Sequence, residues 1–160
     1  MDNMPESPAA RLPSADCLPG AGRGAAAELL ITVLADPGSA STVRERVRAW
    51  LSGWQWPESE AEDIVMAVNE AVANVVDHAY RQHAGPGDAH IYAWTVTEAT
   101  GRRVAVSVTD RGRWRPVPAD PGHRGRGLLM MSACMASLHI EHNTGGTSVV
   151  MISTLVPNSG

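Results

Sequence analysis

The chain has 160 residues, a formal net charge of −4 at pH 7, 44% hydrophobic residues and 19% charged residues. This length leaves room for one domain with a core of its own, and the composition is that of a globular protein. An acidic balance offers no basic surface for a nucleic acid, and no apolar run approaches the roughly 20 residues of a membrane span, so we expect neither as a partner. All 13 basic residues are arginines, which excludes phosphate-binding loops and catalytic sites built on lysine.

Residues 1–27 are rich in proline, alanine and glycine, and we expect them to form a disordered tail before a domain over residues 28–157. The tail carries acidic residues near its start and lacks a continuous apolar centre, so it does not read as a secretory signal. We therefore expect a cytoplasmic protein. Cys17 lies in the tail and Cys134 in an expected helix, which predicts two reduced thiols rather than a disulfide.

The domain is expected to open with a strand and a helix. Glu28–Leu34 is a short, β-branched apolar run, and the Asp-Pro-Gly sequence at 36–38 predicts a turn after it. Apolar residues at helical spacing predict a helix over Thr42–Ser52, with Ser39 or Ser41 as its N-cap.

A second helix carries an unusual row of polar residues. The sequence Ser59-Glu60-Ala61-Glu62 is a capping-box pattern, and the helix that it opens should extend to about Tyr80. Within it Glu70, Asn74 and His78 follow at four-residue steps and form one slanting stripe on an otherwise apolar helix. A solvated face is the ordinary explanation of such a stripe. The alternative is a site for a hard cation that carries a phosphate, in which the carboxylate orients a nucleophile.

The second half of the chain should complete a sheet. Ala89–Thr97 and Arg103–Thr109 alternate as the two strands of an antiparallel hairpin, after a loop at 82–88. Residues 110–127 are irregular, and apolar residues from Leu128 onward then predict a third helix. A closing strand pair is expected over Leu138–Glu141 and Thr147–Leu155. The order β-α-α-β-β-α-β-β predicts an α/β two-layer sandwich, with a mixed, largely antiparallel sheet and all helices on one face.

Four short motifs stand in order on these elements: Glu70 and Asn74 in the second helix, Asp110 and Gly112 at a strand end, Gly125-Arg126-Gly127 opening the third helix, and Gly146-Thr147 opening the last strand. Each alone is explained by an ordinary turn or helix face. Together, on this element order, they resemble the GHKL ATPase superfamily with its Bergerat ATP-binding fold. The resemblance covers residues 28–155 and is greatest to the small anti-sigma-factor serine kinases of the sporulation and stress-response type.

The resemblance implies a role for each motif. Asp110 would accept a hydrogen bond from the adenine amino group, where guanine would present a carbonyl, and Gly112 would leave room for the base. Thr147 would complete the adenine site through its hydroxyl, directly or through water. Asn74 would offer its amide oxygen to Mg²⁺, and Glu70 would deprotonate the attacking hydroxyl. The remaining nucleotide contacts that the resemblance implies come from His78, Arg124, Gly125, Arg126, Gly127 and Leu128.

The chain also departs from the family pattern. Trp114 stands where many members have a second glycine, and the lid between Gly112 and Gly125 is short, so the resemblance implies fewer lid contacts to a bound nucleotide. Trp114 either lines the site or belongs to the core.

The resemblance implies a Mg-ATP-dependent protein serine/threonine kinase that phosphorylates a small protein antagonist, sequesters a sigma factor and forms a homodimer. The alternative is a binding module of the same fold that senses ATP or ADP with little or no phosphotransfer. The catalytic half of a sensor histidine kinase is a weaker third reading, because the chain lacks room for an upstream two-helix phosphoacceptor domain.

Overall fold

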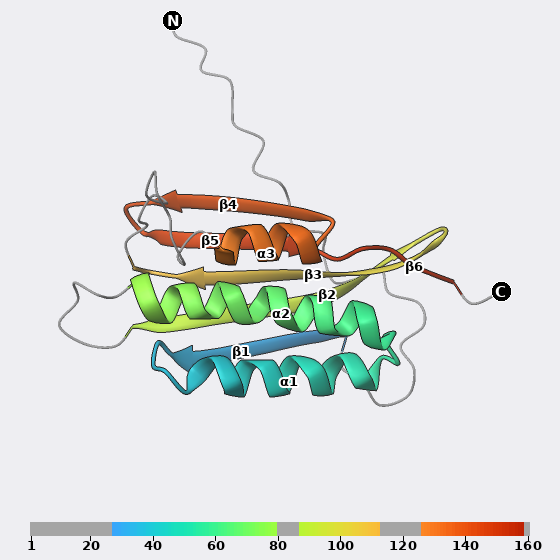
Figure 1. The fold of residues 1–160 in the computed structure, drawn as a ribbon, viewed down its shortest axis with the longest axis horizontal. Helices are drawn as coiled ribbons and strands as arrows, with labels where there is room; N and C mark the ends of the chain where they lie inside the picture. Colours follow the sequence, from blue (N-terminus) through green and yellow to red (C-terminus); the bar gives the residue numbers. More distant parts are fainter. Residues whose placement is uncertain (1–26, 80–86, 113–125, 159–160) are drawn as a thin grey trace, which may run out of the picture.

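The computed structural model describes residues 27–79, 87–112 and 126–158 (Figure 1). All of the expected tail but residue 27 lies outside this part of the chain. The helices and strands are β1 (Glu28–Leu34), α1 (Ser39–Gly53), α2 (Glu58–Asn74), the π-helical turn η1 (Val75–Ala79), β2 (Asp88–Glu98), β3 (Gly101–Asp110), α3 (Arg126–Cys134), β4 (Ser137–Asn143), β5 (Gly146–Ile152) and β6 (Val156–Pro157). The expected order of elements is confirmed, with η1 and β6 as additions.

The strands form one sheet in the order β1-β2-β3-β5-β4, and β6 pairs with the start of β3. Every pairing among the described strands is antiparallel, so the sheet contains no parallel pair of the kind that a mixed sheet would need. Figure 1 shows α1, α2 and α3 side by side over the same face of the sheet. The predicted α/β two-layer sandwich is therefore confirmed.

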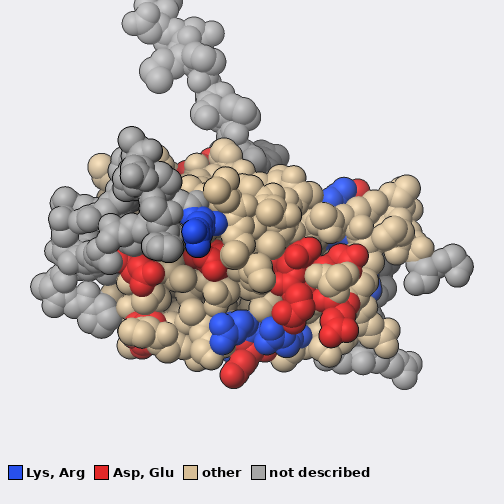
Figure 2. Space-filling view, viewed as in Figure 1, with Lys and Arg blue, Asp and Glu red and all other residues tan. Residues whose placement is uncertain are grey.

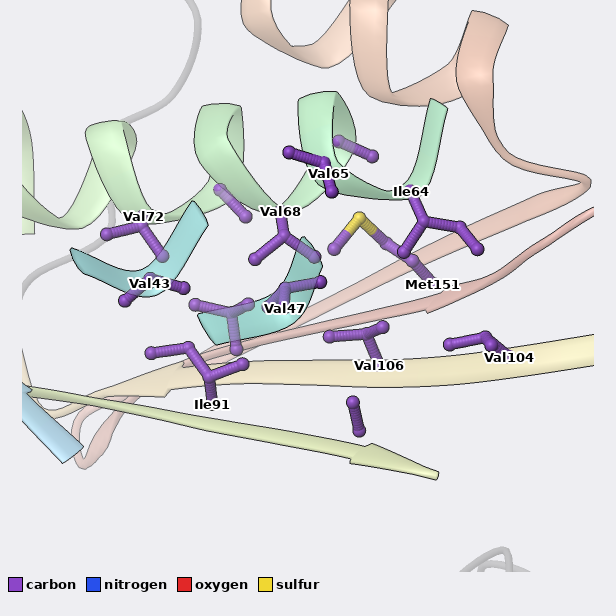
Figure 3. Packing of buried hydrophobic residues seen from close by; sticks show 14 of the residues in the cluster. Val43, Val47, Ile64, Val65, Val68, Val72, Ile91, Val104, Val106 and Met151 are labelled. Atoms are coloured by element: carbon purple, nitrogen blue, oxygen red, sulfur yellow. The ribbon is translucent and has the colours of Figure 1, made fainter. Parts of the chain in front are cut away.

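The core lies between the helices and this face of the sheet. Burial alternates along β2, where Ala89, Ile91, Ala93 and Thr95 are buried, as expected for a strand with one covered face. Figure 3 shows the side chains of the two layers meeting in this space: Val43 and Val47 of α1, Ile64, Val65, Val68 and Val72 of α2, Ile91 of β2, Val104 and Val106 of β3, and Met151 of β5. The close packing of these mostly branched side chains holds α2 over the sheet.

The start of α1 differs from the prediction. The helix begins at Ser39 with Gly38 as its N-cap, and no side chain caps it. The Ser39 hydroxyl instead donates to the carbonyl oxygen of Leu34 and lies 3.0 Å from Oδ1 of Asp36. Asp36 also accepts a hydrogen bond of 2.9 Å from the N–H of Gly38. The serine thus ties the β1–α1 turn together, and that contact replaces the expected cap.

The capping box at the start of α2 is also absent. The helix begins at Glu58 with Pro57 as its N-cap, so Ser59 already lies in the first turn, where its hydroxyl donates to the carboxylate of Glu60. Glu62 pairs with Arg48 of α1, with N···O distances of 3.0 and 3.2 Å. This pairing between two helices is a tertiary contact that no local sequence pattern contains.

A connection to β3 fixes where α2 starts. Arg102 donates hydrogen bonds of 3.0 Å to the carbonyl oxygens of Trp54 and Gln55, and its guanidinium lies 4.6 Å from the ring centroid of Trp56. Gln55 adopts a left-handed backbone with φ of 51°. This anchored turn sets the direction in which α2 crosses the sheet.

None of the helices in the described part of the chain combines the length and the apolar character that a membrane span needs.

Candidate nucleotide-binding site

The motif residues that the structure describes come from elements that meet toward one end of the sheet. In Figure 1 the C-terminal end of α2, the end of β3 and the start of α3 all lie toward the left of the molecule. Asp110 is the last residue of β3, and it pairs directly with Thr147 of β5 in the antiparallel ladder. Two motifs that are 37 residues apart in the sequence are therefore neighbours in the sheet.

Asp110 is a buried carboxylate with a backbone partner. Its side chain is buried, and Oδ1 accepts a hydrogen bond of 2.8 Å from the N–H of Gly112. Burial raises the pKa of Asp110 above its ordinary value, and the bond from Gly112 partly opposes that rise. The carboxylate is held in one orientation by a turn two residues long, which suits an acceptor that must recognise a base.

Thr147 is buried beside it, and Gly146 explains how the two strands come so close. Gly146 has φ of +137°, and a Cβ built on it would lie 1.9 Å from the carbonyl oxygen of Asp110 and 2.8 Å from Cα of Arg111. Both the conformation and the contact require a residue without a side chain. Gly146 therefore allows β5 to pack closely against the end of β3, where Thr147 pairs with Asp110.

Glu70 and Asn74 lie under the first turn of α3. An ideal Cβ on Gly127 would lie 3.2 Å from Oε2 of Glu70, 3.5 Å from Oδ1 of Asn74 and 3.6 Å from its Nδ2. Both side chains are half-buried rather than spread over a solvated face. The stripe on α2 and the glycine motif that opens α3 thus lie side by side, so Glu70 and Asn74 do not form an open solvated face.

The same helix pair brings in two residues that the motif search did not assign. The thiol of Cys134, at the other end of α3, is buried, and it lies near enough to Asp63 of α2 to feel that residue's charge. Burial raises the pKa of this thiol first, and the negative charges of Asp63 and Glu70 raise it further. Cys134 is a free thiol, as expected. Asp63 lies two helical turns before Glu70 on the same face of α2, and it was missed because four-residue steps back from Glu70 lead to Met66 and Glu62 instead.

Residues 33–153 match the family model of the Histidine kinase-like ATPase domain. The chain belongs to this family. The resemblance to the GHKL superfamily that the motifs suggested is thereby confirmed, and a Histidine kinase-like ATPase domain is a domain that binds ATP.

Two solved structures show the similarity in three dimensions. The structure of the RsbU and RsbW domains of Rv1364c from Mycobacterium tuberculosis has 32% sequence identity and a TM-score of 0.65, over 80% of this chain and 32% of that chain. The present chain thus spans about a third of that protein's chain. The histidine kinase domain of the blue-light activated histidine kinase of Erythrobacter litoralis EL346 has 23% identity and a TM-score of 0.48, over 62% of this chain and 46% of that chain.

The structure describes only some of the residues that were expected to contact the phosphates. Arg126 is exposed and Leu128 is half-buried in the first turn of α3, where backbone N–H groups have no partner inside the helix. Arg124 and Gly125 lie outside the described residues, as does Trp114. The backbone of His78 belongs to η1, and its side chain is outside the described part.

The residues present fit a magnesium ion that arrives with a nucleotide. No group of three or more His, Cys, Asp or Glu side chains within residues 27–79, 87–112 and 126–158 is arranged to hold a metal. Mg²⁺ does not need one, because it commonly keeps several waters and takes one or two protein oxygens together with substrate phosphates. Oδ1 of Asn74, facing the first turn of α3, is an oxygen of the required kind.

Proposed function

We propose that this ATPase domain is a Mg-ATP-dependent protein serine/threonine kinase of the anti-sigma-factor type, which phosphorylates a small protein antagonist and sequesters a sigma factor. The contact of Gly127 with both Glu70 and Asn74 is the observation that carries the proposal. It places a carboxylate and an amide oxygen together at the start of a helix. The similarity to the structure of the RsbU and RsbW domains supports the same class of protein.

In this proposal Asp110 and Thr147 recognise the adenine. Gly112 occupies Oδ1 of Asp110, so Oδ2 would accept the hydrogen bond from the adenine amino group. Guanine would instead turn a carbonyl oxygen toward this carboxylate, and two acceptors facing each other repel. The hydroxyl of Thr147, the ladder partner of Asp110, would contact the same base from the neighbouring strand.

The phosphates would lie at the start of α3. The N–H groups of Gly127 and Leu128 and the positive end of the helix dipole favour an anion there. Arg126 would add a positive charge, and Arg124, Gly125 and His78 complete the proposed set. Bound Mg²⁺ would neutralise phosphate charge, with Oδ1 of Asn74 as its protein ligand.

Glu70 would act as the general base. Its carboxylate would take the proton of the substrate hydroxyl while that oxygen bonds to the γ-phosphorus, and the bond to the bridging oxygen breaks to release ADP. Glu70 is the feature that favours an enzyme over an ATP- or ADP-sensing binding module, since nucleotide binding alone does not need a base.

The test is phosphotransfer from Mg-ATP to a purified antagonist protein, followed by mass spectrometry. Glu70→Gln keeps the shape that faces Gly127 and removes the base, so we expect nucleotide binding to persist while phosphotransfer falls on the order of 10² to 10⁴-fold. Asn74→Ala should remove the tightening of ATP binding by Mg²⁺. Phosphotransfer by Glu70→Gln at the wild-type rate would refute Glu70 as the base, and a wild-type chain that transfers no phosphate would support the binding module instead.

The proposal includes a homodimer in the cytoplasm, with protein partners and neither nucleic acid nor membrane as a ligand. Sedimentation of the purified chain with and without ATP would measure the oligomeric state directly.

A further inference from the structure

Three large apolar side chains on α2 and α3 are exposed: Met66 at 45%, Leu129 at 72% and Met130 at 39%. The other large hydrophobic residues exposed in the described part of the chain, Leu30, Leu34 and Ile152, belong to strands β1 and β5. We refer to Met66, Leu129 and Met130 as the methionine surface. Exposed apolar side chains grouped beside a functional site mark a place where another molecule binds.

The packing of α3 on α2 brings the members of the methionine surface together. Gly127 at the start of α3 lies next to Glu70 and Asn74 of α2, and the charge of Asp63 acts on Cys134 near the other end of α3. Figure 1 shows that the two helices run antiparallel along a common seam. Met130 lies midway between these two residues, and Met66 lies midway along the facing stretch of α2. The two methionines therefore sit at the same level on either side of the seam.

The burial of their neighbours shows which way the methionines point. Ala67 follows Met66, and Met131 follows Met130, and both of these are fully buried. Consecutive residues of a helix differ in direction by about 100°, so the methionines face outward while their neighbours face the core. Leu129 extends the apolar surface across α3 on the solvent side.

The protein surface next to Met66 is acidic. Figure 2 shows acidic side chains gathered over the N-terminal half of α2. The acidic residues of this stretch are Glu58, Glu60, Glu62 and Asp63. Of these, Glu62 is neutralised by Arg48, while Glu60 accepts a hydrogen bond from an uncharged hydroxyl. The stretch keeps a net negative charge that a cationic partner would complement.

We propose that the methionine surface docks the protein substrate of the kinase, through an amphipathic segment whose apolar face covers Met66, Leu129 and Met130 and whose arginines or lysines face the N-terminal half of α2. This proposal rests on the proposed function. Methionine side chains are flexible and polarizable, and they adapt to apolar partner surfaces. The acidic residues would steer and orient the basic flank of the partner.

The position of the surface explains how docking serves the reaction. Met66 lies four residues before Glu70 on the same helix, which is about 6 Å along the helix axis. A segment bound across the seam at Met66 and Met130 can therefore extend a serine or threonine hydroxyl to the carboxylate of Glu70. Docking and chemistry would use separate residues of one helix, so they can be separated by mutation.

The experiment compares Leu129→Glu and Met130→Glu with the matched control Leu34→Glu, which makes the same kind of exchange on strand β1. The probe is the purified antagonist protein of the phosphotransfer assay. Its binding is measured by calorimetry, and KM and kcat are measured separately. We expect the two α3 variants to weaken binding and raise KM at least tenfold, with kcat and ATP affinity within twofold of wild type. The control should match wild type in all four quantities.

A second pair of substitutions tests the charge argument. Glu58→Arg with Glu60→Arg should weaken binding about fivefold at low salt and remove most of its salt dependence. Unchanged binding and KM in Leu129→Glu and Met130→Glu would overturn the docking proposal, as would an antagonist that does not bind the wild-type chain. Binding that depends on Leu129 and Met130 without any phosphotransfer would count against the kinase and not against the surface.

Discussion

Asp110 is placed where its charge costs stability, and a functional residue is the usual reason for such a placement. The carboxylate is buried at the end of a strand and its pKa is raised by that burial. Asparagine has nearly the same shape and can keep the acceptor that Gly112 uses. The substitution Asp110→Asn therefore separates the effect of the charge on ligand affinity from its effect on the stability of the fold.

We expect Asp110→Asn to weaken ATP binding about ten- to a hundredfold, because it replaces a charged acceptor with a group that can present a donor. Calorimetric titration with ATP measures this. Wild-type ATP affinity in a folded Asp110→Asn variant would rule out Asp110 as the adenine acceptor.

The same variant should be more stable than wild type at neutral pH when no nucleotide is present. The pKa of Asp110 is higher in the folded state than in the unfolded state, so ionisation opposes folding. This cost is present in full above the folded pKa and disappears as the pH falls below the unfolded pKa. Urea unfolding at several pH values should therefore show an advantage of Asp110→Asn at pH 7 that fades in acid. An advantage that grew in acid would contradict the assignment.

Two adjacent glycines, Gly145 in the β4–β5 turn and Gly146 at the start of β5, should respond very differently to alanine. Gly146→Ala meets the carbonyl oxygen of Asp110 at 1.9 Å in a backbone conformation that alanine rarely adopts, so we expect a loss of at least about 2 kcal/mol. Gly145→Ala meets only the side chain of Asn143, at 3.1 Å, and should cost less than about 1 kcal/mol. Urea unfolding of both variants measures the difference. Equal losses would mean that β5 can shift away from β3.

At the scale of elements, α3 is both a packing helix and the proposed phosphate site. Its N-terminal turn lies next to Glu70 and Asn74, and Cys134 near its C-terminal end lies near Asp63. The glycine at the first of these contacts lets the helix approach α2 closely. A small side chain there would change the spacing of the site before it changed the stability of the fold.

We expect Gly127→Ala to separate stability from activity. Alanine favours a helix over glycine by up to about 1 kcal/mol, which offsets the contact with the movable end of Glu70 at 3.2 Å. The melting temperature should stay level or rise, while phosphotransfer falls about tenfold because the base is displaced. Thermal melts and single-turnover rates give the two quantities. A variant with wild-type turnover would show that the site tolerates a wider spacing of α2 and α3.

At the scale of the whole molecule, the candidate site joins ends of elements from both layers. Asp110 and Thr147 belong to the sheet, while Asn74 and Gly127 belong to the helices. A nucleotide bound across them would link the layers and stabilise the entire fold by mass action.

Mg-ATP at a hundred times its dissociation constant should stabilise the domain by about 2.7 kcal/mol, which raises the melting temperature by roughly 5 to 10 °C for a domain of this size. Mg-GTP at the same concentration should leave it nearly unchanged, because its carbonyl faces Asp110. Scanning calorimetry with each nucleotide makes the comparison. Equal shifts would mean that the phosphates alone hold the ligand.

Local sequence patterns were sufficient for much of the fold. The strand predicted over Glu28–Leu34 has the same bounds as β1. A run of apolar residues and the turn after it depend only on residues that are close in the sequence, so a local pattern is enough to predict them. The two caps were not predictable in the same way. Ser39 bonds back to β1 and Glu62 pairs with α1, so tertiary partners outcompeted the local hydrogen bonds that the patterns favoured.

The sequence by itself determined which residues could carry the chemistry: Glu70 and Asn74 at one spacing in a helix, Asp110 at a strand end, and glycines before α3 and β5. Only the tertiary structure decided which of them meet. The ladder set Asp110 against Thr147, and the seam set Gly127 on Glu70 and Asp63 beside Cys134. These contacts depend on how sheet and helices pack across long separations in the chain, and periodicity within one segment does not contain that information.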